Sequence, residues 1–243
     1  MISFSTEGFQ DNNELKDPAC GILANANAEL AHCGLKLCRN ESGLSLVGDQ
    51  MVLCADLSHM AFRVKPSKLC HELLVRAARI KGADGPLTAI DATAGLGEDA
   101  LLLAAAGFHV ILYENNPVVA ALLIDSLLRA RKIPELVDPL SRMKVIEADS
   151  IDMLPQLTSA PDVIYLDPMF PSRTKSAAVK KKFQLLHQIE KPCGNSESLM
   201  QAAMSATPRK IVIKRPLKGP YLAKIKPSYS LRGKSVRFDV LVL

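Results

Sequence analysis

Short apolar runs alternate with helical patterns of apolar residues from about residue 82 to the end of the chain. Gly82, Gly85 and Pro86 interrupt the chain just before this region, as expected at a break between segments. Two late runs, near Tyr229 and at residues 236–242, predict a hairpin across Arg232-Gly233-Lys234. Five earlier runs predict buried strands at residues 88–91, 110–113, 144–146, 163–166 and 211–213.

Two helices between these strands are marked by their end signals. Residues 98–106 carry a helical pattern that Gly107 ends. Asn116 is a favourable N-cap, Pro117 suits the first helical position, and the pattern then runs to about residue 131. Strands that alternate with helices in this way are typical of an α/β fold with a parallel sheet.

The first 81 residues are less regular. Residues 44–47 and 51–55 predict a hairpin with Gly48-Asp49 as its turn. Ser67 is placed to cap a helix over residues 69–80. We therefore expect an N-terminal extension over residues 1–81 and a larger domain over residues 82–243.

The composition limits the class of protein. At 243 residues and 48% hydrophobic residues, the chain can form one large domain with a substantial core. No apolar run approaches the length of a membrane span, and no signal peptide begins the chain, so a cytoplasmic protein without a membrane partner is expected. The six cysteines include no Cys-x-x-Cys pair, so we interpret them as reduced thiols and expect no metal.

The most informative motif is Asp167-Pro168-Met169-Phe170-Pro171, after the predicted strand 163–166. The carboxylate and the carbonyl of Asp167 can accept hydrogen bonds from an amino group. Pro168 stops strand pairing and stiffens the turn, and Phe170 offers a face for stacking on a flat base. This combination resembles the Asp-Pro-Pro-aromatic motif of methyltransferases that modify exocyclic amines of nucleobases, with Met169 in place of the second proline.

The net charge of +5 conceals an asymmetry that begins at this motif. From Ser172 onward there are 16 Lys and Arg against 3 Asp and Glu, whereas the preceding residues hold 14 and 22. Because a basic surface attracts polyanions and this one follows a candidate base-binding motif, we expect a nucleic-acid partner. The candidates for phosphate contact are Arg173, Lys175, Lys180, Lys181, Lys182, Lys214 and Arg215.

A turn with two glycines, Gly95 and Gly97, follows the first predicted strand. Glycines permit a tight turn and the close approach of a ligand, and the next helix presents unpaired amides at its start. In an open parallel sheet, ligands bind at this edge. The spacing Gly-x-Gly-x-x-Ala, with Glu114 19 residues after Gly95, also fits a dinucleotide fingerprint, so a nicotinamide-dependent oxidoreductase is an alternative.

Acidic residues after three successive strands distinguish these alternatives. Glu114 is placed to hold the hydroxyls of a ribose, Asp149 to accept a hydrogen bond from an adenine amino group, and Asp167 follows the next strand. This pattern is typical of class I methyltransferases that use S-adenosylmethionine. The acids Asp91, Asp99 and Asp167 also suit a cofactor that carries a sulfonium and an amino group, and they suit a pyrophosphate poorly.

Residues 91–97 and 165–171, with 114–123, 175–181, 212–216 and 237–239, resemble the ribosomal RNA small subunit methyltransferase J family. The resemblance covers about residue 81 to the C-terminus. It implies a Rossmann-like class I methyltransferase fold with a mostly parallel seven-stranded sheet, an antiparallel C-terminal strand and a small N-terminal extension. It also implies methylation by S-adenosylmethionine of the exocyclic 2-amino group of a guanosine near the 3′ end of bacterial 16S rRNA.

The resemblance also implies the roles of individual residues. Catalysis is expected at Asp167, Pro168 and Phe170, where hydrogen bonds from the amine would orient its lone pair, and Asp167 or water would take the proton. A non-catalytic RNA-binding module on the same fold remains a third function class. The resemblance implies cofactor contacts at Glu98, Asp99, Glu114, Asn115, Asp149, Ser150 and Asp167. The turn after the first predicted strand adds Asp91, Gly95 and Gly97 to the expected cofactor site.

Overall fold

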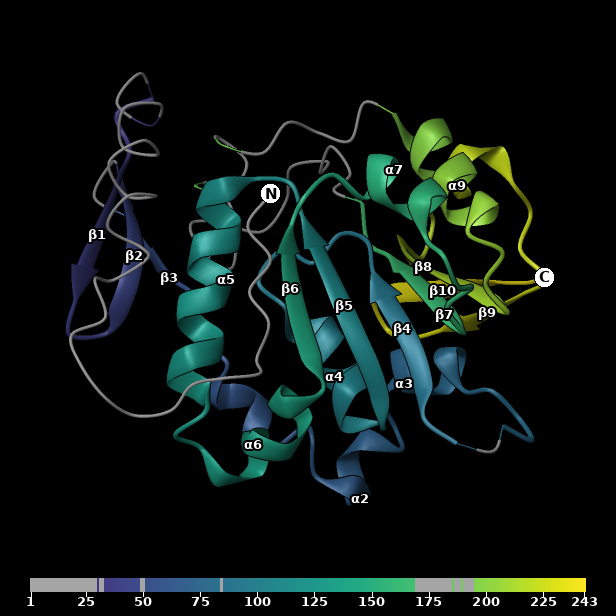
Figure 1. Cartoon of the computed structure of the whole chain (residues 1–243), viewed down its shortest axis with the longest axis horizontal. Helices are drawn as coiled ribbons and strands as arrows, with labels where there is room; N and C mark the ends of the chain where they lie inside the picture. Colours follow the sequence, from purple (N-terminus) through teal and green to yellow (C-terminus); the bar gives the residue numbers. More distant parts are fainter. Residues whose placement is uncertain are drawn as a thin grey trace.

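A seven-stranded sheet forms the centre of the molecule (Figure 1). The computed structural model describes residue 30 and residues 33–48, 51–83, 85–168, 185, 189 and 195–243. The strand order is β6-β5-β4-β7-β8-β10-β9. All pairs from β6 to β8 are parallel, and β10 runs antiparallel to both of its neighbours. The predicted mostly parallel sheet with an antiparallel C-terminal strand is therefore confirmed.

All five predicted central strands form, and the predicted C-terminal hairpin places Arg232 opposite Arg237. Four of the five are longer than predicted, because backbone pairing continues past the apolar residues that mark each strand. The strands are β4 (Leu87–Asp91), β5 (Phe108–Glu114), β6 (Met143–Glu147), β7 (Val163–Leu166), β8 (Lys210–Pro216), β9 (Tyr229–Arg232) and β10 (Val236–Val242).

Both predicted helices form as α4 (Glu98–Ala105) and α5 (Pro117–Ala130). Asn116 caps α5 as predicted, since its side chain accepts hydrogen bonds from the amides of Val118 and Val119. The sequence patterns missed α6 (Pro134–Ser141), which has a proline inside it, together with α7 (Ser150–Met153) and α9 (Ser196–Ser205). No helix in the described part of the chain is long and apolar enough to cross a membrane.

The predicted helix over residues 69–80 is wrong. Two short helices, α2 (Pro66–Leu69) and α3 (Leu73–Ala78), replace it, and Lys65 rather than Ser67 is the N-cap of α2. The backbone at Glu72 is extended, and the Glu72 carboxylate binds the Arg63 guanidinium at 2.8 Å and 2.9 Å. This ion pair stabilises the break between α2 and α3. The helical spacing of apolar residues, on which the prediction relied, does not detect such a break.

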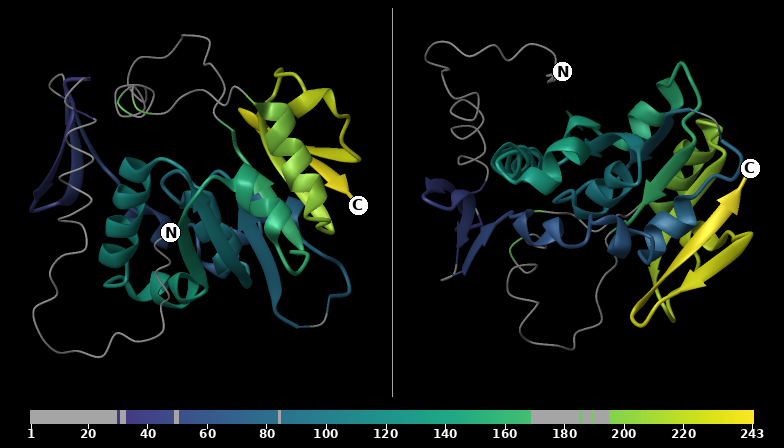
Figure 2. Two further views of the ribbon diagram at one scale, coloured as in Figure 1. Left: turned by 45° about the horizontal axis from the view of Figure 1, so that its top comes forward. Right: turned by 90° about the horizontal axis from the view of Figure 1, so that it is seen from below.

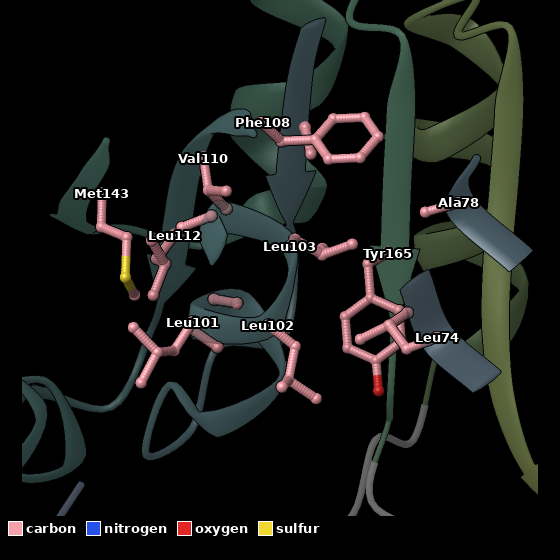
Figure 3. Packing of buried hydrophobic residues seen from close by; sticks show 14 of the residues in the cluster. Leu74, Ala78, Leu101, Leu102, Leu103, Phe108, Val110, Leu112, Met143 and Tyr165 are labelled. Carbon is pink, nitrogen blue, oxygen red and sulfur yellow. The ribbon is translucent and has the colours of Figure 1, made fainter. Parts of the chain in front are cut away.

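Helices cover both faces of the sheet (Figures 1 and 2). One face packs against α3, α4, α5 and α6 through a large apolar cluster, and the other packs against α7, α9 and the 3-10 turn η2 (Leu154–Gln156). Figure 3 shows the first cluster, in which Leu74 of α3 and Leu103 of α4 lie with Tyr165 of β7. Because α3 lies in this core, the chain before residue 82 already contributes to it; the domain boundary at 81 stays a prediction.

A separate three-stranded antiparallel sheet packs on α5, on the side away from the main sheet (Figures 1 and 2). It consists of β1 (Lys36–Asn40), β2 (Gly43–Gly48) and β3 (Met51–Cys54). The predicted hairpin is confirmed as β2 and β3, although Gly48 pairs with Met51 and so belongs to the strand rather than the turn. The sequence patterns missed β1, which is largely polar and exposed.

Asp125 of α5 fastens this small sheet to the helix. Its carboxylate accepts hydrogen bonds from the Leu44 amide at 3.0 Å and from Arg39 and Arg129 at 2.8 Å each. The Asp125 side chain is only 7% exposed. The hydrogen bonds from both arginines and from the amide lower its pKa against the opposing effect of burial.

We expect the Asp125→Ala variant to lose about 1.5–3 kcal/mol of unfolding free energy, since it removes a buried charged acceptor. The measurement is urea unfolding, with the midpoint compared at an unchanged m-value. Asp138→Ala is the matched control, because Asp138 of α6 pairs with Arg142 just after that helix and its side chain is 79% exposed. The control should unfold close to the wild-type urea midpoint, because exposed ion pairs contribute little to stability. Equal losses in the two variants would contradict the anchoring role of Asp125.

Candidate active site

A cleft of about 640 Å³ opens at the carboxyl edge of the main sheet. It lies where β4 is flanked by β5 on one side and β7 on the other. Chain order reverses direction across the sheet at this point, which is where open α/β sheets bind ligands. The cleft is lined by every residue that the sequence assigned to the cofactor, namely Asp91, Gly95, Gly97, Glu98, Asp99, Glu114, Asn115, Asp149, Ser150 and Asp167, and by Pro168.

Gly97 shapes the turn between β4 and α4. It is the N-cap of α4 in a left-handed conformation, with φ of +79°. A Cβ atom added to Gly97 would lie 2.6 Å from a methyl carbon of Leu123. The glycine is therefore required both by the backbone conformation and by the close packing of α5, and it brings the start of α4 to the cleft.

Glu114, at the end of β5, holds the same turn from the opposite side. One carboxylate oxygen accepts a hydrogen bond from the Gly95 amide at 2.9 Å, and the other accepts one from the Asn116 amide at 2.8 Å. Burial raises the pKa of Glu114, and the backbone hydrogen bonds oppose that rise. Each oxygen has a further lone pair, so the carboxylate can still bind the hydroxyls of a ligand.

Asp149 follows β6 and caps the short helix α7. Its Oδ1 atom accepts a hydrogen bond from the Ile151 amide at 2.8 Å. Ser150, the next residue, is buried, and both residues line the cleft. The cap fixes the position of the Asp149 carboxylate in the cleft wall.

Lys214, from β8, joins two carboxylates inside the cleft. Its Nζ atom lies 2.7 Å from Oδ2 of Asp99 and 2.9 Å from Oδ2 of Asp167. Burial alone would lower the pKa of Lys214, but attraction by Asp99 and Asp167 outweighs it and raises that pKa. Lys214 therefore remains an ammonium group and bridges the first turn of α4 to the end of β7.

Two uncharged residues that the sequence did not indicate complete this network. The Tyr165 hydroxyl donates a hydrogen bond to Asp99 Oδ2 at 2.6 Å, and the Asp167 amide donates one to Thr93 Oγ1 at 2.7 Å. Tyr165 is 1% exposed, and a buried tyrosine hydroxyl requires a polar partner. The sequence did contain one signal for Tyr165, since it is the only residue with a polar group in the otherwise apolar strand Val163–Leu166.

Burial also dominates the electrostatics of the remaining acids. It raises the pKa of Asp91 well above its ordinary value, and the nearby Asp99 and Asp167 carboxylates raise it further. Burial likewise raises the pKa of Asp167, while attraction to Lys214 limits the rise. The site thus concentrates negative charge that a single cation compensates in part.

The comparisons with known proteins agree with this geometry. A family model for SAM-dependent methyltransferases matches residues 26–243, where SAM stands for S-adenosylmethionine. Ribosomal RNA small subunit methyltransferase J of Nitrosococcus oceani is 42% identical over 183 residues, which are 74% of this chain and 72% of the relative. The protein of the same name from Pseudoalteromonas atlantica is 39% identical over 223 residues, 86% of each chain.

A solved structure gives the same result for the fold. A SAM-dependent methyltransferase from Neisseria gonorrhoeae superposes with a TM-score of 0.69 at 31% identity, covering 86% of this chain and 83% of the other. The chain belongs to the ribosomal RNA small subunit methyltransferase J family. Its cofactor is S-adenosylmethionine, so the oxidoreductase alternative is set aside.

The charge of the cleft fits this cofactor of the methyltransferase J family. Six acidic residues and one basic residue, Lys214, line it among the residues described. Such an excess of carboxylates attracts the sulfonium and amino groups of S-adenosylmethionine and repels a pyrophosphate. The sequence-based preference for this cofactor over a dinucleotide therefore has a direct counterpart in the structure.

The predicted phosphate contacts separate into three groups. Lys214 faces the cleft, as described above, and its ammonium is engaged by two carboxylates rather than displayed on the outer surface. Arg215 is 2% exposed and donates to the Pro220 carbonyl, so the structure argues against its predicted phosphate contact. The remaining predicted phosphate contacts, Arg173, Lys175, Lys180, Lys181 and Lys182, lie outside the described residues, and so does Phe170, the predicted stacking residue; their roles stay predictions.

The Glu114→Gln variant should bind S-adenosylmethionine at least about tenfold more weakly, because its amide cannot accept both backbone hydrogen bonds that hold the turn. Isothermal titration calorimetry measures the change. The Glu147→Gln variant is the control, since Glu147 lies opposite Glu114 in the β5–β6 register but is exposed and outside the cleft. Unchanged affinity in Glu114→Gln would contradict the role of this carboxylate.

The Lys214→Met variant should move the acid limb of the pH–rate profile of methyl transfer to higher pH. Lys214 favours the ionised form of Asp167, so its removal raises the pKa of Asp167 further and the carboxylate is lost at a higher pH. Lys214→Arg keeps the charge and should shift the limb less. An acid limb that is the same in Lys214→Met and in the wild type would exclude this coupling.

Proposed function

We propose that this protein methylates the exocyclic 2-amino group of a guanosine in bacterial 16S rRNA. Family membership supports an enzyme of small-subunit ribosomal RNA, as the names of its relatives state. The resemblance of residues 165–171 to amine methyltransferases supports the exocyclic amine as the target. The partner on this proposal is 16S rRNA, free or within the small ribosomal subunit.

The observation that carries the proposal is the position of Asp167. Its carboxylate is fixed through Oδ2 by Lys214, and its backbone amide is fixed by Thr93. It lies in the same cleft as the residues assigned to the cofactor. An oriented acceptor at this point, followed by the rigid Pro168, suits the capture of an amino group next to a methyl donor.

In this proposal, the other acidic residues of the cleft each bind a different group of the cofactor. Glu114 holds the ribose hydroxyls, and Asp149 accepts a hydrogen bond from the adenine amino group. Asp91 and Asp99, at the two ends of the turn after β4, attract the cationic amino acid part, and Asn115 and Ser150 line the remaining wall. When bound, S-adenosylmethionine supplies a methyl group on a cationic sulfur, which is the electrophile of the reaction.

Asp167 acts by orienting the amine. The lone pair of a guanine 2-amino group is delocalised into the ring, so the amine is a weak nucleophile. A hydrogen bond accepted at Asp167 turns that lone pair toward the methyl donor, and orientation effects of this kind lower barriers by up to ~7–11 kcal/mol in favourable cases. Methylation releases one proton from the nitrogen, which passes to the Asp167 carboxylate or to water.

The Asp167→Asn variant should lower kcat by on the order of 10²-fold at saturating cofactor and RNA, because the amide is a weaker acceptor and cannot take a proton. The assay follows a labelled methyl group into small-subunit rRNA, and mass spectrometry of nucleosides identifies the product. Asp152→Asn, an exposed carboxylate on α7 outside the cleft, is the control and should retain wild-type turnover.

The same assay separates the proposed function from its alternatives. N2-methylguanosine as the product supports the proposal, whereas another methylated nucleoside overturns the guanine assignment. Absence of any transfer by the wild-type protein, to free RNA and to small subunits, would favour the non-catalytic RNA-binding module. Retained turnover in Asp167→Asn would refute the catalytic role of Asp167.

A further inference from the structure

Two buried guanidinium groups hold the loop after β8, residues 216–221, by donating hydrogen bonds to its carbonyls. Arg215 donates from Nε to the Pro220 carbonyl at 2.9 Å, and Arg237 of β10 donates from Nη1 to several carbonyls of the same loop. Arg215 is 2% exposed and Arg237 is 4% exposed. The carbonyls bound by Arg237 are those of Pro216 (2.8 Å), Leu217 (2.8 Å) and Gly219 (2.9 Å).

We call the guanidinium groups of Arg215 and Arg237 the clamp of this loop. A buried carboxylate holds the clamp in place. Asp239 accepts hydrogen bonds from Arg237 Nε at 2.9 Å and 3.1 Å, and the Ser230 hydroxyl donates to the same carboxylate at 2.5 Å. Burial, followed by repulsion from Arg237, lowers the pKa of Arg215 to about 10, so Arg215 still carries its charge at neutral pH. Two buried cations thus bind a single short loop, and one buried anion binds the second of these cations.

The strand register places this loop beside the reacting end of the cleft. Leu166 of β7 pairs with Ile213 of β8, so Asp167 lies next to Lys214, as their 2.9 Å ion pair shows. Pro216, where the loop begins, follows Lys214 by two residues and ends β8. The start of this loop therefore lies near Asp167, within reach of the nucleotides next to one bound there.

The outer side of the loop presents a cation and an aromatic ring. Lys218 is exposed, and Tyr221 is 41% exposed while Arg237 lies 5.2 Å from the centre of its ring. Asp239 is the only acidic side chain from residue 206 to 243, and it is buried. The exposed basic side chains of this segment are Arg209, Lys218, Lys224, Lys226, Arg232 and Lys234.

We propose that the loop of residues 216–221 is a preformed docking element for the single-stranded RNA next to the target nucleotide. This inference rests on the proposed function. Lys218 binds a phosphate, and Tyr221 stacks on a flanking base with the ring face that Arg237 leaves open. A single strand is required because base faces are covered within a duplex.

The clamp explains why Arg215 and Arg237 are buried although the RNA is a polyanion. They position the loop rather than contact the phosphates. A loop that is ordered before binding loses little conformational freedom on binding, which favours affinity. Arg215 thus contributes to RNA binding through the loop, in place of the direct contact that the sequence predicted.

The test compares Tyr221→Ala and Lys218→Gln with the wild-type protein. The probe is a fluorescently labelled single-stranded oligoribonucleotide with the sequence of the target region, and fluorescence anisotropy gives its Kd. Tyr221→Ala should raise Kd by roughly 5-fold or more through lost stacking. Lys218→Gln should reduce the slope of log K against log salt by about 0.7, as expected for one lost phosphate contact on a single strand.

Lys132→Gln is the matched control, an exposed lysine just after α5 and outside the cleft, and its Kd and salt slope should not change. Arg237→Lys should raise the Kd for RNA without changing the Kd for S-adenosylmethionine; if it does not fold, the two surface variants decide. Wild-type Kd and salt slope in both Tyr221→Ala and Lys218→Gln would overturn the proposal. Equal or tighter binding of the duplex form of the probe would also overturn it.

Failure of this inference and failure of the proposed function can be told apart. If the wild-type protein produces no N2-methylguanosine, the proposed function fails. The changes in RNA affinity at Tyr221 and Lys218 still decide whether the loop is a docking element.

Discussion

The ammonium group of Lys214 between Asp99 and Asp167 is the interaction on which the active site depends. The sheet topology brings several carboxylates to one edge, where burial and mutual repulsion disfavour their ionised forms. One cation placed between two of them opposes this effect, and its attraction limits the rise in the pKa of Asp167. It also joins the start of α4, the end of β7 and the end of β8, so the positions of these elements and the charge of the site are fixed together.

The basic residues of the C-terminal half have three different physical roles. Lys214 works inside the cleft, Arg215 and Arg237 are buried under a loop, and Lys218 belongs to the exposed set. The net charge counts each of these residues as one positive charge, although only the exposed side chains can contact a polyanion directly. The exposed charged side chains of residues 206–243 are basic whereas the cleft is mainly acidic, as expected of an enzyme with a cationic cofactor and an anionic substrate.

Much of the fold followed from the sequence because its signals are local. The Asn116-Pro117 cap, the stop at Gly107 and the apolar run 163–166 each act through neighbouring residues. The break at Glu72 and the strand β1 could not be predicted, since they depend on the Arg63 side chain and on packing against α5. In the site, the acids after the strands were found by their spacing.

Residues that act across strands were harder to predict. Thr93, Tyr165 and the burial of Arg215 arise from contacts between segments far apart in the chain, such as the Tyr165 hydroxyl with Asp99 and Arg215 beneath the loop that follows β8. A linear pattern records that a lysine and an arginine stand side by side at 214 and 215. It does not record that alternation along a strand sends one into the cleft and the other into the interior.

The small sheet at the N-terminus shares an apolar cluster with the turn that forms the cofactor site. Leu96, between the two glycines of that turn, packs against this cluster together with Met51 of β3, and Val119 and Leu122 of α5 lie in its centre. The small sheet and the cofactor turn are consequently linked through one apolar cluster. Insertions or deletions in the hairpin that disturb this cluster would therefore reach the cofactor turn, although no residue of the small sheet lines the cleft.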